Sequence, residues 1–161
     1  MKKSRKELVN TRWTIRRDFP SIVAINNQSL PEITEDDLIK IYHNTQKPVS
    51  LVAEIKEIVV GYVIYFVRSN RYEISHIAVH QDYRQKGIGS VLLNNIKMKL
   101  VPSQEKGPTK DIYNYSMQST SRSRISITVP DHLLHAHLFL RANGFRGQIT
   151  NNDSYRFEYK I

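Results

Sequence analysis

HIAVHQDYRQKGIGSVLL, residues 76–93, joins an apolar strand, a basic turn and the start of a helix. Residues 77–79, IAV, form an apolar run that is typical of a buried strand. Gly87 and Gly89 interrupt the pattern, and apolar residues then recur at helical spacing. The stretch therefore predicts a strand that ends in a glycine-bearing turn at the N-terminus of a helix.

Such a turn presents backbone N–H groups that have no partner within the helix, close to the positive end of the helix dipole. Glycine lets an anion approach closely, and Arg84 and Lys86 add positive charge. The sequence thus predicts a phosphate-binding turn, with glycines that serve turn geometry alone as the alternative. A P-loop is excluded because its Gly-Lys-Ser/Thr is missing, and a dinucleotide fingerprint because Leu92 replaces its third glycine.

Periodicity along the remaining chain predicts the element order β-α-α-β-β-β-α-β-α-β-β. The polar pair Lys56-Glu57 marks a tight reversal between two strands within residues 49–68. The other expected strands are 11–17, 72–80, 124–129, 145–150 and 154–161, and the expected helices are 19–30, 33–44, 88–100 and 132–142.

We expect one domain over residues 1–161, because the composition is 40% hydrophobic and no repeat or linker divides the chain. Residues 1–10 are predicted to be a basic tail. Residues 103–123 are polar and rich in serine, and they are long for a connection inside a domain. We interpret them as a loop, either a lid that orders over a substrate or a flexible connection.

The composition excludes several kinds of site. The chain has no cysteine, so disulfides, thiolate nucleophiles and cysteine-ligated zinc are ruled out. The basic N-terminus lacks the apolar segment of a signal peptide, and no stretch approaches the roughly 20 apolar residues of a membrane span. We therefore expect a cytoplasmic protein without a membrane partner.

A net charge of +9 favours polyanionic partners, such as phosphates, nucleic acid, a ribosome or an acidic protein surface. A basic solvated surface without a dedicated partner is the alternative.

Two blocks resemble the GNAT superfamily of acetyl-CoA-dependent N-acetyltransferases. The family signature, Arg or Gln, two residues, Gly, one residue, then Gly or Ala, matches RQKGIG at Arg84–Gly89. The second block, a strand and helix that end in Gly-Phe, matches ISITVPDHLLHAHLFLRANGF, which ends at Gly144-Phe145. The resemblance covers nearly the full chain. It implies an α+β fold with a mixed central sheet of about seven strands, splayed between strands 4 and 5, and about four helices.

Within this superfamily the chain is most similar to the ribosomal-protein alanine N-terminal acetyltransferases. The shared segments are the IRR-D opening, IAVH-YR-GIG and A-FLRA-GFR. This likeness implies direct acetyl transfer from acetyl-CoA to a protein N-terminus, with a ribosomal protein as one candidate acceptor. A small-molecule amine acetyltransferase and a degenerate module that binds coenzyme A or a ribosome without turnover are the alternatives, because fold does not fix the acceptor.

The resemblance also assigns site residues by position. It implies a β-bulge near Ile77–Val79 whose exposed backbone pairs with the pantetheine arm, and a Val79 N–H that stabilises the oxyanion. The residues that contact the coenzyme would be Ile77, Ala78, Val79, Arg84, Gln85, Lys86, Gly87, Ile88, Gly89 and Ser90.

Two side chains on the predicted strand 72–80 are candidates for the general base. Glu73 matches the position of the catalytic glutamate in histone-acetylating members, with an ion-paired strand carboxylate as the alternative. His76 has an ordinary pKa suited to proton transfer, with a hydrogen-bonded core histidine as the alternative.

The chain departs from the family at three positions. Thr128 and Leu133 replace the glutamate and asparagine common in the ribosomal-protein subgroup, and Leu140 replaces the tyrosine that protonates the leaving thiolate in many members. Another acid or water would then supply that proton, and the tyrosines available for it are Tyr113, Tyr115 and Tyr155.

Three histidines fall within residues 132–137, and His132 and His135 share a helical face. No carboxylate or further histidine follows at the spacing of a metallohydrolase site, so we expect surface histidines and no metal.

Overall fold

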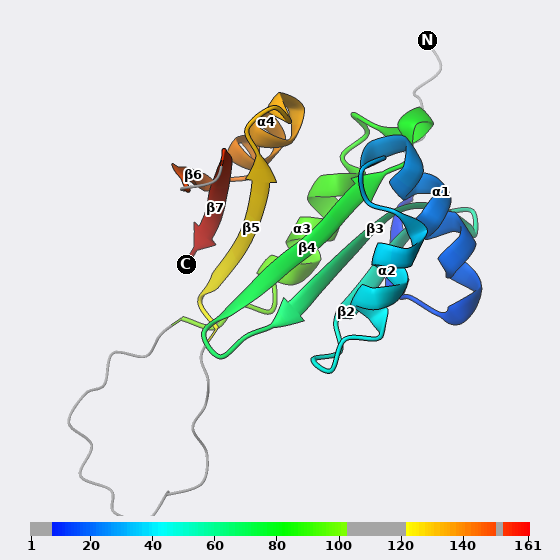
Figure 1. The fold of residues 1–161 in the computed structure, drawn as a ribbon, viewed down its shortest axis with the longest axis horizontal. Helices are drawn as coiled ribbons and strands as arrows, with labels where there is room; N and C mark the ends of the chain where they lie inside the picture. Colours follow the sequence, from blue (N-terminus) through cyan, green and yellow to red (C-terminus); the bar gives the residue numbers. More distant parts are fainter. Residues whose placement is uncertain (1–7, 103–121, 151–152) are drawn as a thin grey trace, which may run out of the picture. The chain divides into compact units, whose positions relative to one another are not determined.

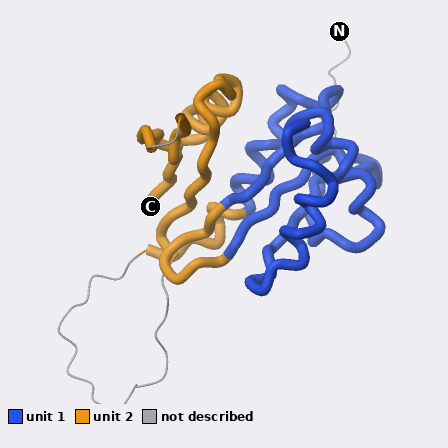
Figure 2. The backbone as a smooth tube through the Cα atoms, viewed as in Figure 1, with its two compact units in different colours: residues 1–66, 74–95 blue, residues 67–73, 96–161 orange. Residues whose placement is uncertain are grey.

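The computed structural model describes residues 8–102, 122–150 and 153–161 (Figure 1). Within these residues, seven strands follow the order β1-β2-β3-β4-β5-β7-β6, and four α-helices join them in the chain order that the sequence predicts. The expected α+β class is confirmed. The chain divides into two compact units, residues 1–66 with 74–95 and residues 67–73 with 96–161 (Figure 2). The splay between strands 4 and 5 concerns both units, so it stays a prediction, as does the single domain.

The first unit contains the meander and the helix after the glycine turn. β1 pairs with β2, and β2 with β3, in antiparallel register. The elements are β1 Asn10–Trp13, α1 Phe19–Ser29, α2 Glu35–Tyr42, β2 Val49–Ile55, β3 Ile58–Val67, β4 Arg71–Val79 and α3 Ile88–Lys97. The last residue of β3, the first three residues of β4 and the last two residues of α3 belong to the second unit.

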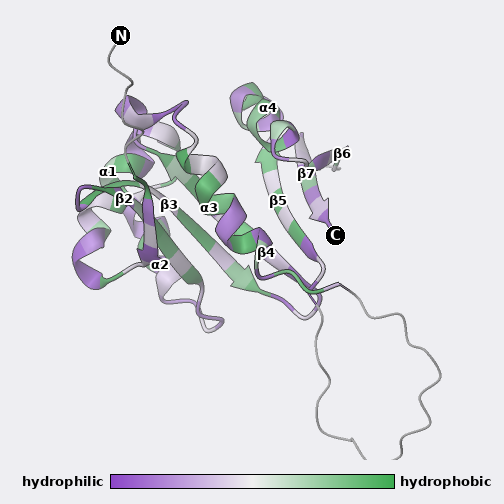
Figure 3. Ribbon diagram, turned by 180° about the vertical axis from the view of Figure 1, so that it is seen from behind, coloured by the Kyte–Doolittle hydropathy of each residue, from purple (hydrophilic) through white to green (hydrophobic). Residues whose placement is uncertain are grey.

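Both faces of this part of the sheet are covered. Successive side chains of a strand point to opposite faces, so those of β3 are buried on both. α1 and α2 lie against one face, and α3 lies behind the same strands (Figures 1 and 3). Tyr62 and Ile64 of β3 pack in one cluster with Ile22, Ile25 and Leu38 of the two covering helices. The hydrophobic colour along β3 in Figure 3 reflects this double burial.

Local signals place two boundaries of this unit. Lys56 and Glu57 form the reversal between β2 and β3 and both adopt positive φ, 49° and 67°, which matches the twist of a two-residue hairpin. At the start of α2 the Thr34 hydroxyl accepts from the Asp37 N–H at 3.2 Å, and the Asp37 carboxylate accepts from the Thr34 N–H at 3.0 Å. This reciprocal cap fixes the helix start at Glu35.

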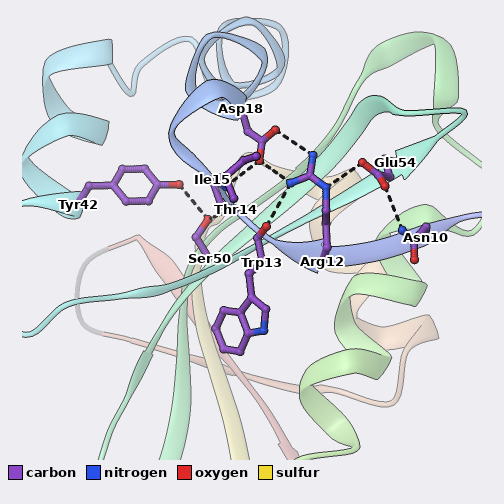
Figure 4. Close-up of polar contacts among 9 residues, drawn as sticks. All are labelled: Asn10, Arg12, Trp13, Thr14, Ile15, Asp18, Tyr42, Ser50 and Glu54. Carbon is purple, nitrogen blue, oxygen red and sulfur yellow. Dashed lines mark hydrogen bonds and ion pairs between the residues drawn. The ribbon is translucent and has the colours of Figure 1, made fainter.

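The first strand ends earlier than the predicted range 11–17, because a buried carboxylate bends the chain. β1 stops at Trp13, and Arg16–Asp18 form a 3-10 turn. Asp18, 3% exposed, accepts from the Ile15 N–H at 2.8 Å and from the Arg12 guanidinium at 2.7 and 3.0 Å (Figure 4). The hydrogen bond from Arg12 lowers the pKa of the Asp18 carboxyl.

Arg12 also joins β1 to β2, since its Nε donates to Glu54 at 2.9 Å. Nearby, the Ser50 hydroxyl of β2 lies 2.7 Å from the Thr14 hydroxyl and 2.9 Å from that of Tyr42 at the end of α2 (Figure 4). These contacts attach the start of α1 to β1 and the end of α2 to β2. None of them involves the glycine turn.

The second unit is built on β5 Arg124–Pro130, α4 Leu134–Ala142, β6 Arg146–Ile149 and β7 Ser154–Lys160. β7 pairs antiparallel with both β5 and β6. α4 begins two residues later than predicted, because Asp131 and His132 form a turn in which the Leu133 N–H donates to the Pro130 carbonyl at 3.2 Å. It ends at Ala142, and Gly144, two residues further on, has the φ of +85° that is typical of a left-handed cap.

Some sequence expectations lie outside the described residues. They are the basic tail up to residue 7 and the polar loop over 103–121, which includes Tyr113 and Tyr115. The last residue of the predicted tail, Asn10, begins β1. In the parts of the chain that the structure describes, no helix is long and apolar enough to cross a membrane.

Candidate functional site

The end of β4 leads into the glycine turn through a short 3-10 turn, Gln81–Tyr83. The His80 N–H donates to the Val60 carbonyl of β3 at 2.8 Å. This bond holds the chain against β3 one residue beyond the end of β4. α3 then starts at Ile88. Because the sheet fixes one end and the helix the other, residues 84–87 form a short exposed bridge between two rigid elements.

The N-terminus of α3 presents free donors toward this bridge. The first intrahelical bond is that of the Val91 N–H to the Gly87 carbonyl, at 3.0 Å. The N–H groups of Ile88, Gly89 and Ser90 therefore have no carbonyl four residues earlier in the helix. They lie at the positive end of the dipole, where an anion is stabilised.

The bridge contains two residues with left-handed backbone angles. Gln85 and Gly87 adopt positive φ, 58° and 81°, so the chain reverses its handedness twice before the helix. A Cβ added at Gly87 would meet no atom within 4 Å. Glycine is therefore favoured here by the positive φ angle and not by a lack of space. Gly89, by contrast, is the second residue of α3.

Both cations of the predicted turn lie at its surface. The Arg84 Nε donates to the Val79 carbonyl at 3.0 Å, and its Nη2 donates to the Ser29 hydroxyl at 2.8 Å. The Lys86 ammonium lies 5.1 Å from the ring centre of Tyr83. The structure thus brings positive charge and unpaired helix amides together at one exposed turn.

A glycine that the sequence analysis did not single out seats the helix. A Cβ on Gly61 of β3 would lie 3.2 Å from the Ala78 carbonyl oxygen, 3.2 Å from Ile88 Cγ2 and 3.4 Å from Leu92 Cδ1. Both helix residues are buried. The start of α3 therefore rests directly on the backbone of β3, a use that an isolated glycine in a strand pattern can signal.

Glu73 is ion-paired. Its carboxylate accepts two hydrogen bonds from the Arg68 guanidinium, both at 3.2 Å, and lies 3.6 Å from Arg71. The hydrogen bond from Arg68 is the main cause that lowers the pKa of the Glu73 carboxyl. A carboxylate held in its charged form in this way is a weaker base than an unpaired one.

His76 has a different environment on the same strand. The imidazole is half-buried, and its Nδ1 lies 2.8 Å from the Ser75 hydroxyl. Burial lowers the pKa of His76, against an opposing effect of the Asp37 charge, so the ring is neutral at neutral pH. The Ser75 contact engages Nδ1 and leaves Nε2 as the second site for a proton.

Residues 77–79 occupy the last part of β4, as expected. Ala78 is buried in the cluster that contains Ile22 and Leu38, and Ile77 and Val79 are half-buried. The Val79 carbonyl accepts a hydrogen bond from the Arg84 guanidinium. The bulge and the oxyanion role of the Val79 N–H stay predictions.

The positions at which the chain departs from the pattern of the family that it resembles belong to the second unit. Leu140 is buried at 1% exposure, Thr128 is exposed on β5, and Leu133 precedes α4. The Tyr155 ring packs edge-on against His137, with 4.9 Å between ring centres. None of these contacts assigns the proton donor for the thiolate.

The histidines of residues 132–137 are dispersed. His132 and His135 are exposed, whereas the His137 Nε2 lies 2.8 Å from the Pro130 carbonyl. Residues 8–102, 122–150 and 153–161 contain no group of three or more side chains that could hold a metal ion.

The sequence model of the Acetyltransferase (GNAT) family matches residues 12–103. No curated protein sequence matches the chain.

Several solved structures share the fold. Ard1 from Thermoplasma volcanium is 16% identical with a TM-score of 0.71, over 95% of this chain and 97% of its own. PaiA N-acetyltransferase from Thermoplasma acidophilum, solved in complex with coenzyme A, is 14% identical with a TM-score of 0.72. The match covers 96% of this chain and 99% of its own. The ribosomal-protein-S18-alanine N-acetyltransferase from Escherichia coli is 14% identical with a TM-score of 0.68. The match covers 96% of this chain and 94% of its own.

We predict that Gly61→Val displaces the start of α3, because the added methyl groups meet the Ala78 backbone and the buried Ile88 side chain. Overpacking of this kind costs about 1–3 kcal/mol of unfolding free energy. Urea unfolding measures that loss, and the amide NMR signals of Ile88, Gly89 and Ser90 should shift. Ile58→Val, at an exposed position of the same strand, is the control. Unchanged stability and unchanged signals in Gly61→Val would contradict the assigned contact.

Proposed function

Because the chain belongs to the GNAT acetyltransferase family, we propose that it acetylates the N-terminal amine of a protein or peptide. Family membership makes it an acyl-CoA-dependent N-acetyltransferase with acetyl-CoA as its co-substrate. The proposal adds the class of acceptor and the residues that act. It is supported by the segments shared with ribosomal-protein alanine acetyltransferases and by the fold shared with such an enzyme.

The observation that carries the coenzyme site is the turn between β4 and α3. Its unpaired helix amides, two positive φ angles and two exposed cations suit the diphosphate of a coenzyme A thioester. In this proposal Ile88, Gly89 and Ser90 donate backbone hydrogen bonds to the diphosphate, and Gln85 and Gly87 shape the turn. Arg84 and Lys86 add electrostatic attraction.

The thioester would lie along the end of β4, where residues 77–79 offer backbone groups to the pantetheine arm. The acceptor nitrogen attacks the thioester carbonyl, a C–N bond forms, and the C–S bond breaks as coenzyme A leaves as a thiolate. The Val79 N–H would stabilise the oxyanion of the tetrahedral intermediate. Direct transfer requires both substrates to be bound at once.

We favour His76 over Glu73 as the general base. His76 is neutral at neutral pH and has one ring nitrogen beyond its contact with Ser75, so it can take a proton from the acceptor ammonium and leave the neutral amine that attacks. Glu73 is held by two arginines. With Leu140 in place of the usual tyrosine, the thiolate would take its proton from water or from the imidazolium that the first step creates.

The acceptor is tested by incubating the protein with acetyl-CoA and a panel of amines. We expect acetylation of peptides with a free N-terminus, coenzyme A release in equal amount, and none with the same peptides blocked at the N-terminus. An internal lysine, polyamines, amino acids and aminoglycosides serve as competing acceptors. Turnover with small amines alone would replace the proposal by the small-molecule alternative, and coenzyme binding without turnover on any amine would identify a degenerate module.

For the base, we predict that His76→Ala lowers kcat/KM by about 100-fold or more, the usual contribution of a general base. The pKa of His76 is depressed, so the base is present above that pKa and is lost as pH falls through a value below about 6.5. The wild-type kcat/KM should therefore fall on the acid side, and this fall should vanish in His76→Ala. Glu73→Gln is the matched control and should change kcat/KM only a few-fold. The reverse ranking of the two variants would identify Glu73 as the base.

A further inference from the structure

The last two residues of α1 contact the glycine turn, although more than fifty positions separate them along the chain. The Ser29 hydroxyl accepts from Arg84 Nη2 at 2.8 Å. The Gln28 Oε1 accepts from the Gln81 N–H at 3.2 Å, and its Nε2 lies 3.4 Å from His80 Nε2. α1 thus contacts both the start of the turn and its principal cation.

Two contacts hold the Arg84 side chain in one conformation. Its Nε is bound to the Val79 carbonyl, at the end of β4, and its Nη2 is bound to Ser29. A guanidinium has five N–H donors, so three remain for an anion after the two bonds made to described residues. An exposed arginine otherwise loses much rotamer freedom when it binds a ligand, and an arginine that is already held loses less.

Gln28 acts on the backbone at the start of the turn. The Gln81 N–H that it accepts lies in the first residue of the 3-10 turn, just after the last strand residues. The neighbouring His80 ring also accepts from the Asp82 N–H at 3.3 Å and packs edge-on against Tyr83, 5.6 Å between centres. Gln28 therefore supports a local cluster whose conformation determines where the chain enters residues 84–87.

We propose that Gln28 and Ser29 are positioning residues for the coenzyme: they hold the turn and Arg84 in the conformation that receives the diphosphate. The inference rests on the proposed coenzyme site, and it adds that α1 preorganises this site from outside the family signature. Neither side chain needs to touch the coenzyme. Their effect passes through Gln81 and Arg84.

Titration calorimetry with coenzyme A tests the proposal on the full chain. We expect Gln28→Ala and Ser29→Ala each to weaken binding roughly two- to ten-fold, the usual effect of losing one immobilising contact. Ser29→Thr keeps the hydroxyl and should keep the affinity. Asn27→Ala is the matched control, because Asn27 is exposed on the same helix turn and makes no hydrogen bond to the described turn residues. In steady state, KM for acetyl-CoA should rise with kcat within about two-fold of wild type.

A double-mutant cycle separates positioning from general destabilisation. In an Arg84→Ala background, Ser29→Ala should cause no further loss of affinity, because its only proposed route is through the guanidinium. Unchanged or tighter binding in both single variants would overturn the inference, as would a lower Tm with unchanged affinity. Absence of coenzyme A binding by the wild-type protein would instead overturn the proposed coenzyme site itself.

Discussion

The close seating of α3 on β3 is the constraint on which the site depends. Gly61 has no side chain, so Ile88 and Leu92 reach the sheet backbone and the N-terminus of α3 is held beside the end of β4. A helix N-terminus in solution would find water for its unpaired amides. Held against the sheet, the same amides face a fixed, exposed turn. The ion pair of the buried Asp18 with the half-buried Arg12 then secures α1 on the opposite face, from which its last residues reach that turn.

Local chemistry made much of this fold predictable. The strand, the glycine turn and the helix of residues 76–93 were expected from periodicity, and the structure has β4, the turn and α3 at these positions. The start of α2 likewise depends only on neighbours in sequence, because Thr34 and Asp37 form a reciprocal capping box there. Lys56-Glu57 was recognised by its polarity, although neither residue is a usual choice for positive φ.

The differences arise from side-chain pairings that hydrophobic periodicity does not encode. The first strand ends at Trp13 and not at residue 17, because Asp18 is neutralised by Arg12 and captures the Ile15 N–H. Sequence patterns cannot show that pairing. For the same reason no local signal marked Gln28 as a neighbour of the glycine turn, nor decided whether Glu73 is ion-paired. Gly61 had a signal, an isolated glycine in an apolar strand, whose partner only the structure supplies.

The central claim is that helix amides at the start of α3 recognise the coenzyme diphosphate. An NMR titration of isotopically labelled protein with coenzyme A tests it most directly, because each backbone N–H reports separately. We expect saturable shifts that are largest at Ile88, Gly89 and Ser90, with smaller changes in the amides of α2. Binding that leaves these three signals in place and moves those of another surface would contradict it.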